Sequence, residues 1–319
     1  MHRFALATLA ALLLAGSASA ALTPRQLLIR YQPTLVLEPG ERFRPTAVEP
    51  FLAASELEAR TADGRWLPRG PASVLPAADP AGCVSGAGAP CWRLNLRGCT
   101  ADAGLSALVC YAALENSGGA VYARLVSTPS RIVLQYWYLY AFNFWSARNP
   151  PTDFIWRSHE GDWELVAVIL SKRQQPVQLA VSQHCGGRRR AWTKVRTSAR
   201  THPIVYVALG SHANYFAPGQ YRHDPRCYPQ AANEIFRVNG IVPSDFALDG
   251  VPLLASRTTL VSVSARSPSW VAFPGAWGEP GYFHAPGVNT VSFGTGPEGP
   301  AFHRTWTDVA RTILRWPLG

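Results

Sequence analysis

A short segment between residues 158 and 164 holds the densest group of side chains that could do chemistry. It reads Ser-His-Glu-Gly-Asp-Trp-Glu and leads into an apolar run that is predicted to be a strand. Because side chains alternate between the two faces of a strand, Asp162 and Glu164 would project from the same face. Two carboxylates on one face, with His159 close before them, can surround one divalent cation, and such oxygen-rich ligation favours Ca²⁺, Mg²⁺ or Mn²⁺ over Zn²⁺. The spacing therefore predicts a metal site made of Asp162, Glu164 and His159.

The same motif also has a purely structural interpretation. Asp162 and Glu164 could pair with arginines on a solvated face, and Gly161 could simply make a turn. The chain offers many such partners, because it has 30 Lys and Arg and only Lys172 and Lys194 are lysines. The motif alone leaves the metal site and the structural role equally open.

Further polar residues belong to neighbouring predicted strands, and antiparallel pairing in order would bring His159, His184 and His212, at strand ends or turns, toward one edge. Four of them are candidates for ligand binding: Gln135, Asn143, His184 and His212. If a bound metal activates water, the candidate general bases are His159, His184 and His212, and the substrate would be an ester, a phosphoester or a glycoside. For each single histidine the alternative is a hydrogen-bonded structural role.

A basic balance does not by itself identify a partner. The formal charge of +10 comes from arginines scattered over the chain, and the one basic run is Arg188-Arg189-Arg190. That run could contact phosphate or lipid headgroups, although three residues in a loop are usually solvated. Nucleic-acid binding requires a basic stripe or a recognisable module, and the sequence has neither. A serine hydrolase is also disfavoured, because there is no Gly-x-Ser-x-Gly and the adjacent Ser211 and His212 would point apart in a strand.

The elements that must position these residues are mostly strands. Between residues 119 and 216, aromatic and β-branched runs recur between Gly, Pro, Asn and Ser breaks, which is typical of consecutive strands. The predicted strands are 121–127, 131–142, 163–170, 177–183 and 204–209, with two more at 34–37 and 260–265. No helix of useful length interrupts this block, which favours antiparallel pairing over βαβ units.

Short helices are expected outside that block, at 24–31, 48–59 and 308–315. Together with the strands they predict a mainly β protein, an antiparallel β-sandwich with a few short peripheral helices. The length of 319 residues allows one large domain or two, since single cores stop growing at about 250–300 residues.

The first 20 residues have the pattern of an export signal. His2 and Arg3 precede an apolar run, and Ala18-Ser19-Ala20 ends in the small-x-small pattern of a cleavage site. The run is too short to span a bilayer, which takes about 20 apolar residues, and no later segment reaches that length without charge or proline. We therefore expect a signal peptide at 1–20 and an exported single domain at 21–319, periplasmic or extracellular, without a transmembrane segment.

Export changes the interpretation of the six cysteines. An even number of cysteines in an oxidising compartment favours disulfides over thiolate metal ligands or a nucleophile. Six cysteines allow fifteen connectivities, of which local pairing is the one predicted: Cys83 with Cys91, Cys99 with Cys110, and Cys185 with Cys227. Four of these cysteines lie in a stretch rich in Pro, Gly and Ala, which predicts an irregular insertion around 68–118.

The order of the motifs resembles the family named after vacuolar protein sorting-associated protein 62. The segments that carry the resemblance are 30–33, 39–43, 135–137, 159–164, 182–184, 202–203, 208–216 and 299–302. They cover most of the expected mature chain except the cysteine-rich stretch. The resemblance favours one domain and implies no established activity.

The segment 158–164 is also similar to the Gly-His-Arg-His-Asp-Trp-Glu heptapeptide of the necrosis- and ethylene-inducing peptide 1-like proteins. His159, Asp162, Trp163 and Glu164 stand in the matching places, whereas residues 158, 160 and 161 depart from the heptapeptide. In that family the histidine, aspartate and glutamate line a divalent-cation site on a β-sandwich that docks on sphingolipid headgroups and damages plant membranes.

This second resemblance implies that Asp162 and Glu164 are metal ligands and that His159 is a direct or water-mediated partner. The aspartate that the family supplies from an upstream strand has Asn143 or Asp153 as its counterpart here, so cytolysis is not implied. Residues and resemblance together predict an exported protein that binds a divalent cation and, through it, a glycolipid headgroup or a sugar. The alternatives are a metal-dependent hydrolase and a structural acidic motif without a ligand.

Overall fold

The computed structural model describes residues 21–80, 82–83, 90–114, 119–147, 155–285, 287–293 and 296–319. The predicted signal peptide and Asp153 lie outside these residues.

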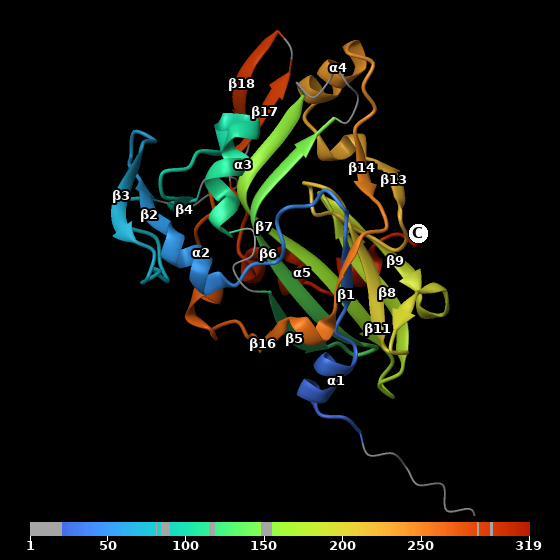
Figure 1. Cartoon of the computed structure of the whole chain (residues 1–319). Coiled ribbons are helices and arrows are strands. Elements are labelled where there is room, and N and C mark those ends of the chain that lie inside the picture. Colours follow the sequence, from blue (N-terminus) through green and yellow to red (C-terminus); the bar gives the residue numbers. More distant parts are fainter. Residues whose placement is uncertain are drawn as a thin grey trace, which may run out of the picture.

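The larger layer of the fold is a mainly antiparallel sheet of eight strands (Figure 1). Its central strands are long because 132–146 and 156–170 are rich in aromatic and β-branched residues, which fit a buried pleated surface. In path order the strands are β16 (Thr259–Ser262), β5 (Ala120–Ser127), β6 (Ile132–Ser146), β7 (Trp156–Leu170), β17 (Gly281–Ala285) and β18 (Val288–Phe293), and β7 also pairs with β8 (Pro176–Gln183), which pairs with β9 (Gly186–Ala191). The predicted run of consecutive strands is confirmed, although β7 begins at Trp156 rather than Trp163.

A second sheet of five strands packs on this layer. It consists of β10 (Thr197–Ser198), β11 (His202–Val207), β1 (Thr34–Leu37), β15 (Val251–Leu253) and β12 (Asn214–Tyr215). Leu35, Leu37, Val205 and Val207 belong to the same buried core as the side chains of β6 and β7. The two sheets therefore form a β-sandwich, as predicted. Two pairings in it are parallel, β1 with β11 and β5 with β16, and each joins segments far apart in the chain.

Two smaller β units complete the fold. A three-stranded sheet of β3 (Trp66–Pro71), β2 (Ser55–Arg60) and β4 (Trp92–Leu96) lies at the side of the sandwich away from β8 and β9 (Figure 1). The strands β13 (Gly219–Arg222) and β14 (Ser244–Ala247) form an antiparallel pair, and the segment that connects them contains α4 (Gln230–Val238).

Two of the predicted helices differ from the structure. The segment 48–59 forms a helix only at α2 (Val48–Ala54), because β2 follows at once and pairs on both sides, with β3 and β4. The segment 308–315 is not a continuous helix, since Asp308 leaves the helical region with φ −132° and ψ 68°. Besides α2 and α4, the helical elements of the described residues are α1 (Pro24–Arg30), α3 (Ala107–Cys110), α5 (Arg304–Thr307) and the 3-10 turns η1 (Ala101–Ser106), η2 (Tyr111–Leu114), η3 (Trp192–Lys194), η4 (Pro225–Cys227), η5 (Ala255–Arg257), η6 (Ser269–Ala272), η7 (Pro300–Phe302) and η8 (Ile313–Arg315).

All six cysteines are paired, and the predicted local connectivity is confirmed. The bonds are Cys83–Cys91, Cys99–Cys110 and Cys185–Cys227. Such disulfides are typical of proteins that fold in an oxidising compartment. Within the described ranges, no helix is both long and apolar enough to cross a membrane.

Candidate functional site

A cavity of about 300 Å³ gathers most of the residues that the sequence singled out. We call it the motif cavity, and its polar walls come from five of the predicted site residues: Asn143, His159, Asp162, Glu164 and His184. They reach it from β6, from β7 and from the residue after β8. Strands distant in sequence therefore bring these side chains together.

Gly161 explains how His159 and Asp162 come to line the same cavity. Strict alternation would put two residues three positions apart on opposite faces of β7. Gly161 has a φ of +57°, a left-handed conformation that changes the side to which the preceding residues point. A Cβ at this position would lie 2.0 Å from the carbonyl oxygen of Trp277. Only glycine fits both the backbone and the space.

We expect Gly161→Ala to destabilise the fold strongly. The left-handed backbone alone costs a non-glycine residue about 1–2 kcal/mol, and the backbone carbonyl of Trp277 adds a clash. Gly64→Ala is a matched control, because Gly64 has φ +86° and no atom within 4 Å of its Cβ position. Thermal unfolding should show a clearly larger loss for Gly161→Ala, and equal losses would contradict this account of the strand.

The side chain of Asp162 is kept ionised by the buried, protonated side chain of His212. Its Oδ2 accepts hydrogen bonds from Asn143 Nδ2 (3.0 Å) and His212 Nδ1 (2.9 Å). The His212 ring stacks on Tyr140 with a centroid distance of 3.9 Å, and its Nε2 lies 3.5 Å from Glu41 Oε1. Burial disfavours the charged imidazole, but the Glu41 and Asp162 carboxylates prevail and raise the pKa of His212 to about 10. His212 is therefore an imidazolium between two carboxylates.

Glu164 stands in a different electrostatic state from Asp162. Its Oε2 accepts hydrogen bonds from Ser182 Oγ and from Asn214 Nδ2 (3.0 Å). Burial, and then the charge of Asp162, raises the pKa of Glu164 well above its usual range. For Asp162, burial acts in the same direction, but the hydrogen bond and charge of His212 and the hydrogen bond of Asn143 hold its pKa below the usual value. Asp162 thus supplies the permanent negative charge of the motif cavity.

Glu160, inside the same motif, has a structural role on the other side of the sheet. Its Oε1 accepts from Tyr111 OH (2.6 Å), and its Oε2 accepts from the amides of Leu96 (3.2 Å) and Glu279 (3.1 Å). The carboxyl is fully buried. It ties η2, β4 and the segment before β17 to the sheet.

This buried carboxyl predicts a pH-dependent stability. Burial raises the pKa of Glu160 from 4.5 to about 8, so the folded state holds its proton more tightly than the unfolded state. The free energy of unfolding should then fall as pH rises from 4.5 to about 8. Each pH unit between the two pKa values is worth about 1.4 kcal/mol. In Glu160→Gln the amide keeps the contacts without the charge, and its melting temperature should decline less over this range; parallel curves would contradict the assignment.

Gln135, another predicted ligand-binding residue, is not part of the motif cavity. It is fully buried, and its Nε2 donates to the carbonyl oxygen of Thr305 at 2.7 Å. His212 also lies behind the cavity wall rather than on it, since the residue is fully buried against Tyr140. The structure brings Asn143, His159, Asp162, Glu164 and His184 together and gives Gln135 a packing role.

A second cluster, which sequence analysis missed, centres on Asp245. This fully buried carboxylate accepts hydrogen bonds through Oδ2 from His184 Nε2 (2.7 Å) and Tyr215 OH (2.6 Å), and through Oδ1 from Ser211 Oγ (2.6 Å). His223 Nε2 lies 3.0 Å from Oδ1. Burial opposes the charge, but the two imidazoles hold the pKa of Asp245 well below its usual range. We call Asp245, His184 and His223 the histidine cluster.

The histidine cluster has the spacing of metal ligands. One nitrogen of His184, one of His223 and one oxygen of Asp245 all lie within 4.8 Å of one another. Among the residues that the structure describes, this is the group of three that could hold a metal ion, and the predicted set of Asp162, Glu164 and His159 is not packed so closely. Asp245 could not be singled out from a local pattern, because its strand, β14, reaches the site through the long-range pairing with β13.

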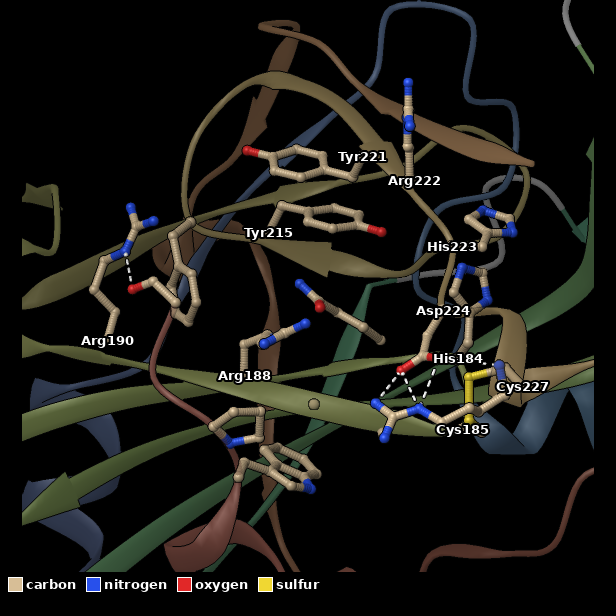
Figure 2. A pocket seen from close by; sticks show the side chains of 18 residues that line it. His184, Cys185, Arg188, Arg190, Tyr215, Tyr221, Arg222, His223, Asp224 and Cys227 are labelled. Atoms are coloured by element: carbon tan, nitrogen blue, oxygen red, sulfur yellow. Dashed lines mark hydrogen bonds and ion pairs between the residues drawn. A yellow bond between two sulfur atoms is a disulfide. The ribbon is translucent and has the colours of Figure 1, made fainter. Parts of the chain in front are cut away.

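A cleft of about 590 Å³ adjoins the motif cavity. We call it the arginine cleft, because Arg188, Arg190, Arg222 and Arg226 line it; the first three are labelled in Figure 2. Its other prominent side chains are Tyr215 and Tyr221, whose rings stack at a centroid distance of 3.9 Å, as well as His184, Cys185, His223 and Cys227, which line the motif cavity too. The basic run 188–190 lies in strand β9 rather than in the expected loop.

No family model matches this chain. A curated relative, "Vacuolar protein sorting-associated protein 62" of Saccharomyces cerevisiae, is 28% identical over 152 residues, which cover 39% of this chain and 30% of the relative. The match thus spans less than a third of that relative's length.

Solved structures with some likeness to the chain include three at low sequence identity. "Toxin fold for microbial attack and plant defense" is 14% identical and covers 60% of this chain and 67% of that chain, with a TM-score of 0.34. "NLPPya in complex with glucosamine" is 16% identical over 61% and 68%, with a TM-score of 0.34. Necrosis and Ethylene inducing Protein 2, from the causal agent of cocoa's Witches Broom disease, is 20% identical over 62% and 69%, with a TM-score of 0.31. Both resemblances expected from the motifs are represented in these comparisons.

Proposed function

We propose that this chain is an exported protein that binds a divalent cation in the motif cavity and uses the cation to hold a polar ligand, a sugar or the headgroup of a glycolipid. The observation that carries the proposal is the pair of carboxyl groups on one cavity wall, of which Asp162 is ionised and Glu164 would release its proton when a cation binds. Asp162 and Glu164 each have one oxygen fixed by protein donors. In the described residues no protein donor bonds the other oxygen, Asp162 Oδ1 or Glu164 Oε1. These two oxygens are the proposed ligands of a hard cation.

His159 has the state that a third ligand requires. Its Nδ1 lies 2.7 Å from the carbonyl oxygen of Gly161, and because a carbonyl only accepts, Nδ1 carries the proton. The lone pair is then on Nε2, which is the usual arrangement of a histidine that coordinates a metal or its bound water. Burial lowers the pKa of His159 and keeps the ring neutral.

The remaining walls of the motif cavity suit a sugar. Its volume of about 300 Å³ is at the lower end of the range for small-molecule sites, about 300–1,000 Å³. Trp145, Trp163 and Tyr228 line it beside the polar groups, and aromatic rings offer apolar faces for the C–H faces of a sugar ring. The adjoining arginine cleft would accommodate a negatively charged part of the ligand.

Calorimetry with Ca²⁺, Mg²⁺ and Mn²⁺ tests the cation, and titration with neutral and acidic monosaccharides with and without EDTA tests the ligand. The wild type should bind at least one of the three ions, and Asp162→Asn should lose that binding. Glu298→Gln, on a carboxylate outside the motif cavity, is the control and should bind as the wild type does. Absence of binding by the wild type, or equal binding by Asp162→Asn, contradicts the proposal.

The alternative function of the motif cavity is that of a metal-dependent hydrolase. Of its candidate bases, His159 and His184 line the cavity, whereas His212 is buried and already protonated between Glu41 and Asp162. If the protein hydrolyses esters, phosphoesters or glycosides and EDTA stops the reaction, the site is that of a hydrolase rather than a binding site alone.

Export is proposed from the signal-like sequence at 1–20 and is supported by the three disulfides. Expression with the native leader should give a protein outside the cytoplasm whose intact mass corresponds to a start at Ala21. A mass that retains residues 1–20 would contradict this prediction.

A further inference from the structure

We propose that His184, His223 and Asp245 form a second metal site, which binds a divalent transition ion of the zinc type. The site lies where the motif cavity meets the arginine cleft, since His184 and His223 line both. It uses none of the ligands proposed for the hard cation, so metal binding at the two sites can be tested separately.

The ligand atoms lie close together. Nε2 of His184 is 2.7 Å and Nε2 of His223 is 3.0 Å from an oxygen of the Asp245 carboxylate, and the three ligand atoms all lie within 4.8 Å of one another. Tetrahedral zinc with ligand bonds of about 2.0–2.2 Å separates its ligand atoms by about 3.3–3.6 Å. Side-chain adjustments within the cluster would therefore admit the ion between the three groups.

His223 has a buried nitrogen without a hydrogen bond. Its side chain is 1% exposed, and Nε2 makes no hydrogen bond although Asp245 Oδ1 is 3.0 Å away. The nearest polar atom to this nitrogen is thus an oxygen of the carboxylate with which His223 pairs, and a metal ion between the two groups would be coordinated by both.

The groups around the cluster resemble the supporting shell of a metal site. Nδ1 of His223 is hydrogen-bonded to Tyr228 OH, which leaves Nε2 for the ion when Nδ1 is the donor. Ser211 Oγ and Tyr215 OH each donate to the Asp245 carboxylate at 2.6 Å. Hydrogen bonds of this kind fix the orientation of ligands and raise metal affinity.

A disulfide holds the two histidines in place. His184 directly precedes Cys185, and His223 lies four residues before Cys227, the other half of the bond. Figure 2 shows His184 and His223 next to each other beside this disulfide, with ring centroids 4.2 Å apart. The covalent link fixes the end of β8 against the segment that carries His223, so the cluster is preorganised for an ion.

The donor set selects the class of ion. Two imidazoles and one carboxylate suit Zn²⁺ and related transition ions, whereas Ca²⁺ and Mg²⁺ prefer oxygen alone. Three protein ligands also leave a coordination position for water or a ligand oxygen. The side chain of His184 is 20% exposed, so this position can open toward the adjoining cavities.

The test measures Zn²⁺ and Co²⁺ binding to the tag-free, metal-stripped protein by competition with a chromophoric chelator and by the Co²⁺ absorption spectrum. We expect about one ion per chain. His184→Asn should weaken Zn²⁺ binding at least about 100-fold, because even the loss of a supporting hydrogen bond costs about 10–100-fold. Asparagine tolerates the φ of +50° at this position. His284→Asn, at a histidine outside the cluster, is the matched control and should bind as the wild type does.

Two further variants allow the test to be interpreted if His184→Asn does not fold or if both metal sites are occupied. Should His184→Asn fail to fold, Ser211→Ala removes one hydrogen bond to Asp245 and should weaken Zn²⁺ binding about 10-fold. Asp162→Asn should keep Zn²⁺ binding while losing the hard cation, which separates this site from the proposed function. Absence of binding by the wild type, or unchanged binding by both cluster variants, would show that the cluster is a hydrogen-bonded structural network and would overturn the proposal.

Discussion

His212→Gln is expected to lower the free energy of unfolding by about 3–5 kcal/mol, the usual cost of removing one partner from a buried ion pair. The substitution removes the imidazolium that lies between Asp162 and Glu41. Both carboxylates are buried, with side-chain exposures of 11% and 2%, so their mutual repulsion would no longer be compensated. Chemical denaturation of the variant and the wild type measures the difference.

The same variant should respond more strongly to a divalent cation. In the wild type the charge of His212 opposes a cation at Asp162, and the neutral glutamine does not. Saturating Ca²⁺, Mg²⁺ or Mn²⁺ should therefore restore more stability to His212→Gln than it adds to the wild type. His202→Gln is the control, because the His202 ring is hydrogen-bonded to a backbone carbonyl, that of Gln32, and not to an acid. A variant as stable as the wild type would contradict the buried imidazolium.

Loss of the Cys185–Cys227 disulfide should have an effect of similar size. This bond closes a loop with a sequence separation of 42, for which the chain-entropy relation gives about 4 kcal/mol. Replacing both cysteines by serine should also release His184 and His223, which the bond holds side by side. We therefore expect a lower melting temperature together with weaker Zn²⁺ binding.

The Cys83–Cys91 bond offers a matched comparison. Its sequence separation is 8, for which the same relation gives about 2.5 kcal/mol, and its cysteines do not line the motif cavity or the arginine cleft. The double serine variant there should lose less stability and keep Zn²⁺ binding. Equal effects of the two double variants on Zn²⁺ would argue against the preorganised histidine cluster.

Several strands and the pairing of the cysteines were predictable from patterns within short stretches of the sequence. The strands β1, β5 and β8 follow directly from runs of β-branched and aromatic residues between turn residues. The pairing of Asp162 and Glu164 on one face follows from alternation within β7. Short-range disulfides follow from the spacing of the cysteines.

Features that depend on long-range pairing were not predictable from one sequence. The segment 55–60 has helix-forming residues, but pairing with β3 and β4 makes it a strand. The charge state of His212 depends on Glu41, which is far from it in the sequence and close to it only in the folded chain. Asp245 and His223 meet His184 only because β13 pairs with β14 beside the end of β8. Such sites contain no local motif, and only the fold assembles them.

The positive φ of Gly161 was the most informative detail that the sequence concealed. The glycine reads as an ordinary turn residue, yet it determines that His159 shares a cavity with Asp162. A glycine at this position therefore has a conformational role.

Anomalous diffraction from crystals grown with Mn²⁺ tests the proposed cation site most directly. We expect a peak in the motif cavity within about 2.6 Å of Asp162 Oδ1 and Glu164 Oε1, with His159 bound directly or through water, and no such peak in Asp162→Asn crystals. A map without density at these carboxylates, at a concentration of Mn²⁺ that saturates binding in solution, would contradict the claim that the acidic motif is a cation site.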